Sequence, residues 1–416
     1  MVVLGDLGRS PRMLYHARAL ADSGGEVHLV GHRDTELPPE IAGDGRIAVH
    51  VLPSPAGARR HRLPRPLFVA LALWNAIRAA AALRRVLSRT TGPGSLILVQ
   101  NPPAIPTLGV ALLVARARHA RLVVDWHNLG WTMLALRLGP RHPAVRLARA
   151  VERVLGRRAD AHLSVSDALA TELSRWGVGP ATVLHDRPEA GFAPPQPEDR
   201  QRLRRELEQR LGVSGLAGDG YDGHPALIVS PTSWTADEDF GLLVDAAVRW
   251  EEQLRPPLPR LAVLITGEGP LRAEYERRFA ALRLERVQLR TLWLEAAEYR
   301  RFLGAADLGL CLHRSASGLD LPMKVADLFG SGVPVVAFDY GPCLGELARD
   351  GENALLFRTG EELVQCLQRA LDGFPREAAL LDRLRAGVAR DAAERWADAW
   401  KATAQGVLVP GPCAQA

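Results

Sequence analysis

Short apolar runs alternate along the chain with longer stretches that have helical periodicity. Runs of about four to eight aliphatic residues bounded by polar ones are typical of buried strands. Most connections between them are long enough for a helix, which indicates parallel strands joined by crossover helices. In the first half of the chain the expected strands are Val2–Leu4, Val27–Val30, Ile47–Leu52, Leu96–Gln100, Leu122–Trp126, Ala161–Ser166 and Ala181–His185.

The pattern stops near residue 190 and starts again near residue 225. Residues 191–224 are rich in proline, glycine and charge, which predicts a linker with one solvated helix. The pattern therefore predicts two doubly wound, Rossmann-like α/β domains, residues 1–190 and 225–380. The expected strands of the second domain are Ala226–Ser230, Leu261–Thr266, Val287–Leu292, Leu308–Leu312, Pro334–Phe338 and Ala354–Phe357.

A final helix is expected from about Asp382 to Val407. Trp396 and Trp400 lie four residues apart in it, which gives the helix one apolar face. We expect residues 381–416 to pack back towards the N-terminal domain. Ligands of doubly wound sheets bind at the carboxyl ends of the strands, so the site residues should follow the strands, in a cleft between the two domains.

Composition narrows the classes of function. The chain has 416 residues, 47% of them apolar, which indicates a soluble globular protein. Its pI is near 9.3, but the net charge is only +5 and no basic segment is interleaved with aromatic residues. We therefore expect no nucleic-acid partner, and instead an anionic substrate or an anionic membrane surface. The scattered cysteines indicate reduced thiols and no zinc site. They are Cys311, Cys343, Cys366 and Cys413.

The longest apolar stretch, Pro66–Leu83, is shorter than the ~20 residues of a spanning helix and is interrupted by Asn75 and Arg78. Two interpretations stay open: a buried core helix with basic flanks, or a helix that lies on an anionic membrane face. We expect the segment from Arg59 to Arg89 to hold the protein on a membrane without crossing it. No signal peptide is visible, and the chain opens on a strand. The arginines before the stretch are Arg59, Arg60, Arg62 and Arg65.

The loop after the first strand, "GDLGRSPRM", has small residues that turn tightly into a helix, whose free N–H groups attract an anion. It lacks the third glycine of a dinucleotide fingerprint, so NAD binding is not expected. An ordinary strand-to-helix turn is the alternative. Arg9 and Arg12 favour a phosphate-bearing ligand. The candidate acceptor- or phosphate-binding residues of this domain are Gly8, Arg9, Ser10, Arg12, Asn101 and Asn128.

Polar and aromatic residues also follow two later strands, in "QNPP" and "DWHNLGW". His127 is the candidate general base, because histidine titrates near neutral pH. Asp125 lies two residues earlier, on the same side of the strand, and is expected to orient His127. The alternative is an ordinary surface histidine.

Two loops of the second domain carry small and hydroxyl-bearing residues at strand ends. "SPTSWTADEDF" offers the hydroxyls of Thr232 and Ser233, and Asp237 or Asp239 is suited to cap the next helix. "ITGEGP" brings Gly267 and Gly269, which allow a close backbone approach. Each loop alone is a weak signal, and together they predict a ligand site in this domain.

"HRSASGLDLPMKVADLFGSGVP" contains one of only two lysines in the chain, Lys324; the other is Lys401. Pro322 is expected to start a helix, which places Lys324 in its first turn, where N–H groups and the helix dipole favour a diphosphate. Asp327 lies one turn further on the same face and is suited to accept ribose hydroxyls. A solvated helix residue is the alternative for Lys324, but a surface cation in this chain is nearly always arginine.

Several segments together resemble the chitobiosyldiphosphodolichol β-mannosyltransferase family, in order and over nearly the whole chain. They are "VVLGDLGRSPRM", "LVQNPP", "LVVDWHN", "SPTSWTADEDF", "ITGEGPL", "LWLEAAEY" and "SGLDLPMKVADLFG". The resemblance implies a GT-B fold with the acceptor mainly at the first domain and the nucleotide-sugar at the second. It implies GDP-mannose as donor, a GlcNAc2-diphosphate-lipid as acceptor, and a peripheral location on the cytoplasmic side of a membrane. It adds to the donor-binding candidates Leu294, His313, Arg314, Ser317, Gly318 and Leu321.

The eukaryotic members of that family begin with a transmembrane helix, which this chain does not show. We therefore expect a bacterial relative, or a truncated chain, and in a bacterium the acceptor need not be dolichol-linked chitobiose.

Making a β-mannoside from α-linked GDP-mannose inverts the anomeric carbon, so one displacement suffices. It needs a base, and cations such as Lys324 and Arg314 for the departing diphosphate. We expect no metal, because no metal-binding DxD motif stands beside a strand and Asp237–Asp239 is expected to start a helix. We expect no cofactor either. Two alternatives remain: a glycosyltransferase with another nucleotide-sugar or lipid-linked acceptor, and a nucleotide-sugar-binding protein without turnover.

Overall fold

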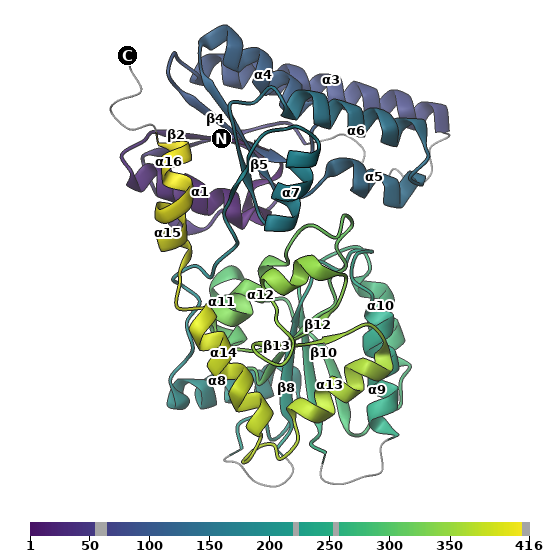
Figure 1. The fold of residues 1–416 in the computed structure, drawn as a ribbon. Helices are drawn as coiled ribbons and strands as arrows, with labels where there is room; N and C mark the ends of the chain where they lie inside the picture. Colours follow the sequence, from purple (N-terminus) through teal and green to yellow (C-terminus); the bar gives the residue numbers. More distant parts are fainter. Residues whose placement is uncertain (55–64, 219–223, 253–257, 410–416) are drawn as a thin grey trace. The chain divides into compact units, whose positions relative to one another are not determined.

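The computed structural model shows the fold of the chain (Figure 1). It describes residues 1–54, 65–218, 224–252 and 258–409, with the backbone alone at residues 65–70, 72 and 73. The chain forms two compact units, Met1–His185 with Ala397–Ala416, and Asp186–Trp396. Both units are parallel α/β sheets of doubly wound topology, which confirms the predicted fold class.

Unit 1 contains a seven-stranded parallel sheet with strand order β3-β2-β1-β4-β5-β6-β7. The order reverses between β1 and β4, and this is the switch point at which such sheets bind ligands. The strands are β1 (Val2–Asp6), β2 (Val27–His32), β3 (Ile47–Val51), β4 (Leu96–Asn101), β5 (Arg121–Trp126), β6 (Ala161–Ser164) and β7 (Thr182–Val183). The helices are η1 (Leu7–Arg9), α1 (Pro11–Asp22), α2 (Pro39–Ala42), α3 (Arg65–Thr90), α4 (Thr107–Arg118), α5 (Gly130–Leu138), α6 (Pro143–Gly156) and α7 (Asp167–Arg175).

The register of β4 and β5 brings the polar ends of both strands together. Gln100 lies opposite Asp125, and Asn101 lies opposite Trp126. Residues 122–126 of β5 are all buried, because both faces of a parallel sheet are covered by helices. The hydrophobic run therefore ends in the interior, and the polar residues after it lie at the carboxyl edge of the sheet.

Unit 2 contains a six-stranded parallel sheet with strand order β10-β9-β8-β11-β12-β13 and its switch point between β8 and β11. The strands are β8 (Ala226–Pro231), β9 (Leu261–Thr266), β10 (Val287–Thr291), β11 (Leu308–Cys311), β12 (Val335–Phe338) and β13 (Ala354–Phe357). The helices are α8 (Pro197–Leu211), α9 (Phe240–Glu251), α10 (Arg272–Ala280), α11 (Ala296–Leu303), α12 (Met323–Gly330), η3 (Pro342–Glu346), α13 (Gly360–Ala370) and α14 (Ala379–Asp391).

The helix expected as solvated, α8, is instead packed onto unit 2. Leu203 and Leu207 are buried. Arg204 contacts the buried carboxylate of Asp307 at 2.8 Å, and Arg200 contacts it at 2.9 Å. The high charge of this segment suggested a solvated face, but part of that charge neutralises an acid inside the unit.

The single final helix expected from Asp382 to Val407 is wrong. α14 ends at Asp391, and the chain becomes helical again in α15 (Trp396–Ala399), the π-helical η4 (Trp400–Ala404) and α16 (Gln405–Leu408). The N–H of Trp396 donates to the Pro188 carbonyl at 3.1 Å, and this bond replaces the helical one. Further on, Trp400 donates from Nε1 to Nδ1 of His16 at 2.9 Å, so the terminal segment packs on α1.

No helix in the described part of the chain is long and apolar enough to cross a membrane. In α3, Leu83 and Leu87 are buried, whereas Trp74 and Ile77 are exposed. The buried leucines fit a core helix, whereas the exposed Trp74 and Ile77 fit a helix that lies on a membrane. Both interpretations of this stretch therefore stay open. Arg59, Arg60 and Arg62, which are expected to contribute to binding an anionic membrane, lie outside the described residues.

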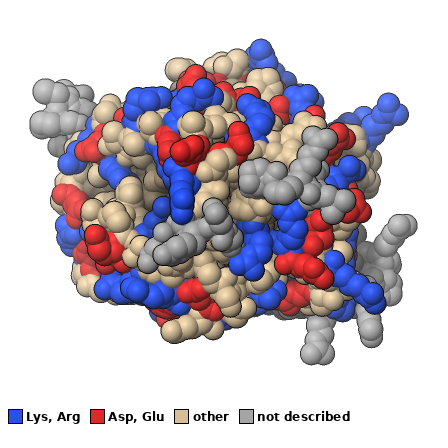
Figure 2. Space-filling model, turned by 90° about the horizontal axis from the view of Figure 1, so that it is seen from below, with Lys and Arg blue, Asp and Glu red and all other residues tan. Residues whose placement is uncertain are grey.

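Surface charge of both signs is interspersed on the face that Figure 2 shows, with no extended area of basic side chains. A nucleic-acid surface needs lysine and arginine clustered on one face. That face of the protein therefore does not provide one. Cys311, Cys343 and Cys366 are buried and belong to no disulfide, and Cys413 lies outside the described residues.

Candidate active site

The carboxylate of Asp125 is the centre of a buried polar cluster in unit 1. It is the penultimate residue of β5, has no exposed surface, and accepts hydrogen bonds from Arg12 at 2.9 and 3.0 Å. Burial alone would raise the pKa of Asp125, but the Arg12 guanidinium and His127 hold it well below its usual range. Asp125 is therefore a permanent anion beneath the carboxyl edge of the sheet.

His127 is oriented by Asp125, as the sequence predicted. Its Nε2 lies 2.8 Å from Oδ2 of Asp125. An ionised carboxylate can only accept, so Nε2 carries the proton and Nδ1 is left as the basic nitrogen. About a fifth of the His127 side chain (21%) is exposed. The ring is thus held at Nε2 by Asp125 and keeps part of its surface open to solvent, as a general base requires.

Arg12 does not fit its predicted role as a phosphate ligand. Its side chain is 1% exposed. Besides the two bonds to Asp125, it donates from Nη1 to the Leu184 carbonyl at 2.8 Å. The guanidinium of this α1 residue therefore uses its hydrogen bonds to link α1 to β5 and to the residue that follows β7. Its effect on the site is indirect, because it fixes the charge of Asp125.

Asn101 also has a structural role in place of the predicted acceptor contact. The residue is fully buried, and its Nδ2 donates to Oε1 of Glu152 at 2.6 Å and to the Asn128 carbonyl at 3.3 Å. Glu152 also accepts from the backbone N–H of Gly130 at 2.9 Å and of Trp131 at 3.3 Å. Asn101 and Glu152 together fix the loop that carries His127 and Asn128.

Sequence reasoning missed Glu152. The available signal was that it is the only acidic residue between Gly130 and Arg158, in a segment rich in arginine. Burial raises the pKa of Glu152, opposed by its hydrogen bonds from Asn101, Gly130 and Trp131. The Asn128 side chain accepts from the N–H of Leu129 at 2.7 Å and is half-buried.

The loop after β1 is compact and is braced from the side. A Cβ on Gly8 would lie 2.3 Å from Oγ1 of Thr35, so glycine is required there by packing. Asp6 accepts from Thr35 Oγ1 at 2.7 Å, and Ser10 donates to the Asp6 carbonyl at 3.0 Å. Arg9 keeps 56% of its side chain exposed. Of the two predicted cations here, Arg9 is therefore the one that is open to an anionic ligand.

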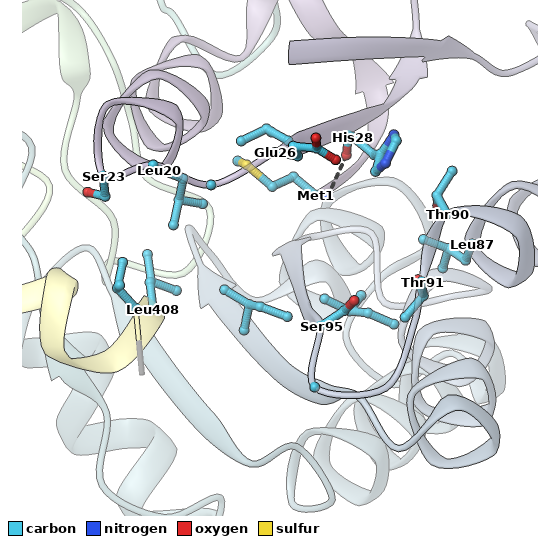
Figure 3. Close-up of a pocket in the computed structure, with 17 residues that line it drawn as sticks. Met1, Leu20, Ser23, Glu26, His28, Leu87, Thr90, Thr91, Ser95 and Leu408 are labelled. Carbon is cyan, nitrogen blue, oxygen red and sulfur yellow. Dashed lines mark hydrogen bonds between the residues drawn. The ribbon is translucent and has the colours of Figure 1, made fainter. Parts of the chain in front are cut away.

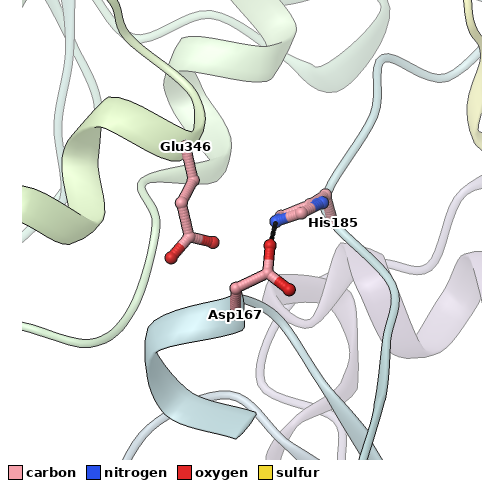
Figure 4. A group of neighbouring side chains, drawn as sticks. All are labelled: Asp167, His185 and Glu346. Carbon is pink, nitrogen blue, oxygen red and sulfur yellow. Dashed lines mark ion pairs between the residues drawn. The ribbon is translucent and has the colours of Figure 1, made fainter. Parts of the chain in front are cut away.

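Another partly exposed histidine of unit 1, besides His127, has an acidic neighbour. Nε2 of His185 lies 3.5 Å from Oδ2 of Asp167 (Figure 4). The His185 side chain is 23% exposed, close to the 21% of His127, and it lies beyond the end of β7. Its resemblance to His127 in type, exposure and partner makes it a suitable control for mutagenesis.

A cavity of about 400 Å³ lies at the opposite edge of the unit 1 sheet (Figure 3). Met1, Val27 and Leu96 line it at the amino ends of their strands, together with Leu408 of α16. None of the predicted site residues lines it. The cavity is thus separate from the polar edge that carries His127.

In unit 2, the glycines after β9 fit tightly against the loop after β8. A Cβ on Gly267 would lie 1.8 Å from the Thr232 carbonyl oxygen, and a Cβ on Gly269 would lie 1.8 Å from that of Ser233. Gly267 also has φ +144°, which side chains disfavour. The two predicted loops therefore form one backbone surface at the carboxyl edge.

Lys324 lies in the first turn of α12, as expected, and Pro322 is the N-cap residue. Its ammonium group donates to Oε1 of Glu238, which is buried, while 18% of the lysine side chain is exposed. Burial would lower the pKa of Lys324, but the Glu238 carboxylate outweighs it and raises the pKa. Lys324 is therefore charged, and one of its three N–H bonds is used by Glu238.

Glu238 is a second residue that sequence reasoning missed. It also accepts from the Thr232 hydroxyl, and from the Ser233 N–H at 2.9 Å. Its neighbours point elsewhere: Asp237 contacts His313 at 3.2 Å, and Asp239 caps α9 by accepting from the Gly241 N–H at 3.0 Å. Glu238 therefore links Lys324 to the loop after β8.

His313 lies between two carboxylates. Nδ1 is 3.2 Å from Asp237 and Nε2 is 3.2 Å from Asp320. Burial would lower the pKa of His313, but these two acids raise it to about 9. His313 is thus a cation at neutral pH with both ring nitrogens engaged, and it contributes charge in place of the predicted direct contact.

The loop before α12 is ordered by its own hydroxyl groups. The N–H of Gly318 donates to Ser315 Oγ at 2.8 Å, and the N–H of Leu319 donates to Ser317 Oγ at 3.0 Å. Gly318 has φ +74°. Arg314 is half exposed, with its guanidinium 4.8 Å from the centre of the Phe338 ring. Leu321 and Leu294 are buried apolar residues of the same edge.

Asp327 follows Lys324 by one helical turn. Tyr299 donates from its hydroxyl group to Oδ2 of Asp327 at 3.1 Å. Burial raises the pKa of Asp327 to about 7, although the hydrogen bond from Tyr299 opposes this shift. Asp327 thus changes charge near neutral pH, and its predicted bond to ribose hydroxyls favours the ionised form.

Two doubly wound α/β units, with a cationic helix start in one and an oriented histidine in the other, define the GT-B class of glycosyltransferase. Family comparison agrees: the Glycosyl transferase 4-like domain matches residues 8–185, and Glycosyl transferases group 1 matches residues 227–373. A glycosyltransferase structure from Rickettsia africae ESF-5 has a TM-score of 0.60 over 97% of this chain and 96% of its own, at 13% identity. That similarity concerns the fold.

Two curated relatives are similar over nearly the whole chain. The chitobiosyldiphosphodolichol beta-mannosyltransferase of Mus musculus is 37% identical, over 97% of this chain and 87% of the relative. The protein named UDP-glycosyltransferase TURAN of Arabidopsis thaliana is also 37% identical, over 98% of this chain and 96% of the relative. The chain belongs to the chitobiosyldiphosphodolichol beta-mannosyltransferase family and is a glycosyltransferase.

Proposed function

We propose that the protein transfers mannose from GDP-mannose to a GlcNAc2-diphosphate-lipid, forming a β-1,4-mannoside with inversion. The near full-length similarity to the mannosyltransferase of Mus musculus carries this proposal. Incubation with each nucleotide-sugar and a short-chain lipid-diphosphate GlcNAc2 acceptor tests it. A donor other than GDP-mannose, or hydrolysis of the donor without transfer, would contradict it.

Each unit supplies one part of the displacement. In unit 1, Nδ1 of His127 accepts the proton of the acceptor hydroxyl, while Asp125 stabilises the imidazolium that forms. In unit 2, Lys324 and the first N–H groups of α12 stabilise the charge of the departing diphosphate. Asp327 accepts from ribose hydroxyls. Neither step calls on a metal or a cofactor.

The base of the donor is expected to be guanine, read by backbone groups between Thr291 and Tyr299. Trp293 in this loop is 42% exposed, and its Nε1 donates to Glu295 at 3.0 Å. By calorimetry we expect GDP to bind at least roughly tenfold more tightly than UDP, a difference of about 1.4 kcal/mol. Tighter binding of UDP would overturn the donor assignment and would favour the chemistry in the Arabidopsis relative's name.

The acceptor lipid stays in a bilayer while its diphosphate reaches the site, so the proposal includes a peripheral location on the cytoplasmic side of a membrane. The exposed Trp74 and Ile77 of α3 support such a location. The basic flank expected to assist them lies partly outside the described residues. The described part of α3 thus fits the expected membrane-facing segment, and other helices of unit 1 can add to the same surface.

A further inference from the structure

We propose that the helical pair α5–α6, residues 130–158, is a surface of unit 1 that docks on an anionic lipid bilayer. This inference rests on the proposed function for its biological purpose, but its physical basis is independent of the reaction. It differs from the segment Arg59–Arg89 suggested by the sequence. The two helices pack against each other and lie directly after β5 (Figure 1).

Large apolar side chains are exposed on both helices. On α5, Leu136 is 69% exposed and Met133 is 50% exposed, and their spacing places them on one face. On α6, Leu147 is 62% exposed, and Val154 lies two turns further on the same face. A protein surface seldom exposes so many large apolar residues in one short segment unless something covers them.

The charge of the segment is almost entirely positive. It contains seven arginines and a single acid, Glu152, and that acid is buried. Arg137, Arg141 and Arg146 are exposed next to the apolar residues. The chain as a whole has a net charge of only +5, so this segment is an unusual concentration of charge. A partner that matches it must be both anionic and apolar.

A bilayer with anionic lipids offers both properties, since head groups attract arginine and the acyl boundary accepts leucine and methionine. A second copy of this surface would place arginines against arginines, which disfavours a symmetric dimer. Nucleic acid would satisfy the arginines but would leave the exposed apolar residues without a partner. Anionic lipid is therefore the occupant that the surface favours.

The surface is connected to the site through hydrogen bonds already described. α5 begins three residues after His127, and Glu152 of α6 accepts from the N–H groups of Gly130 and Trp131 and from Asn101. These contacts fix α5 and α6 to the carboxyl ends of β4 and β5. A bilayer bound to the two helices would thus lie at a fixed distance from His127, as a membrane-anchored acceptor requires.

Vesicle co-sedimentation tests this surface with the full chain at low salt. We expect binding to vesicles that contain phosphatidylglycerol and much weaker binding to pure phosphatidylcholine. Replacing the three arginines, R137Q with R141Q and R146Q, should weaken anionic-vesicle binding roughly 100-fold. Replacing the two leucines, L136Q with L147Q, should weaken it at least roughly tenfold.

Matched controls change the same charge or polarity elsewhere. R277Q with R283Q and R390Q removes three exposed arginines of unit 2, and V51Q alters an exposed apolar residue of β3. Both should bind vesicles like the unaltered protein. Circular dichroism checks that every variant is folded, since all the replaced side chains are exposed.

Equal vesicle binding by the arginine variant and its control would overturn the proposal, as would no binding by the unaltered protein. If the unaltered protein does not bind vesicles but dimerises through these residues, the surface is a contact between two copies of the chain. If it instead binds RNA through them, the surface is a nucleic-acid site. Transfer to a water-soluble, short-chain acceptor should be unchanged in the α5–α6 variants. If the unaltered protein also fails that transfer assay, the proposed function fails while the vesicle result still decides the surface.

Discussion

Replacing Lys324 by alanine is expected to lower kcat/KM roughly 30- to 1000-fold. This corresponds to a loss of about 2–4 kcal/mol of transition-state stabilisation. The ammonium group lies at the start of α12, where it stabilises both the bound diphosphate and the diphosphate that leaves. Donor affinity and the rate of transfer should therefore fall together. Calorimetry with GDP and steady-state kinetics measure the two effects.

The ion pair with Glu238 requires a second variant, because alanine would leave a buried carboxylate without its counterion. Breaking such a pair costs on the order of 3–5 kcal/mol of folding stability. Lys324→Met combined with Glu238→Gln removes both charges and retains the volume. We expect this variant to fold and still to bind GDP weakly, which separates the effect on binding from that on stability.

Lys324→Arg tests why a lysine is kept in a chain that uses arginine almost everywhere else. The planar guanidinium is larger and prefers a two-oxygen approach, so it should recover only part of the lost activity. Lys401, the other lysine, is exposed, and Lys401→Arg should have no measurable effect. A fully active Lys324→Arg enzyme would mean that this site needs only a positive charge.

Replacing His127 by alanine is expected to lower kcat roughly 100-fold or more and to leave GDP affinity nearly unchanged. The reason is that His127 belongs to unit 1, whereas the residues expected to bind the donor belong to unit 2. Asp125→Asn is a poorer test, because it leaves the buried Arg12 without its counterion and destabilises the fold. Single-turnover kinetics isolates the chemical step.

His185→Ala is the matched control, since His185 has a similar exposure and its own acidic neighbour, Asp167. We expect its kcat to stay close to that of the unaltered enzyme. If His127→Ala turns over at the full rate, His127 is not the base. Asp6 would be the next candidate for the base. Burial would raise the pKa of Asp6, but hydrogen bonds from Thr35 and Asp34 outweigh it and keep the pKa below its ordinary value, which makes Asp6 a weaker base.

Residues with a local signal could be predicted from the sequence. The strands were recognisable because both faces of a parallel sheet are buried, and their ends then located Lys324, His127 and the paired glycines. Asp125 could be assigned to orient His127 because the two lie two residues apart on one strand. In these cases the relevant geometry is set by nearby residues.

Residues whose roles depend on distant partners could not be predicted. Arg12 looked like a phosphate ligand because the sequence does not reveal that Asp125, 113 positions away, neutralises it in the interior. Glu238 was hidden between two other acids, and only the folded loop separates their three roles. The interruption after α14 is likewise accompanied by a bond from the N–H of Trp396 to the distant carbonyl of Pro188.

The most direct test of the account is the anomeric configuration of the product made from GDP-mannose and a GlcNAc2-diphosphate-lipid acceptor, read by NMR. A single displacement at the α-linked donor, with His127 as base and Lys324 at the leaving group, predicts a β-mannoside. An α-mannoside would contradict the single displacement, and the absence of any mannosylated product would contradict the proposed reaction itself.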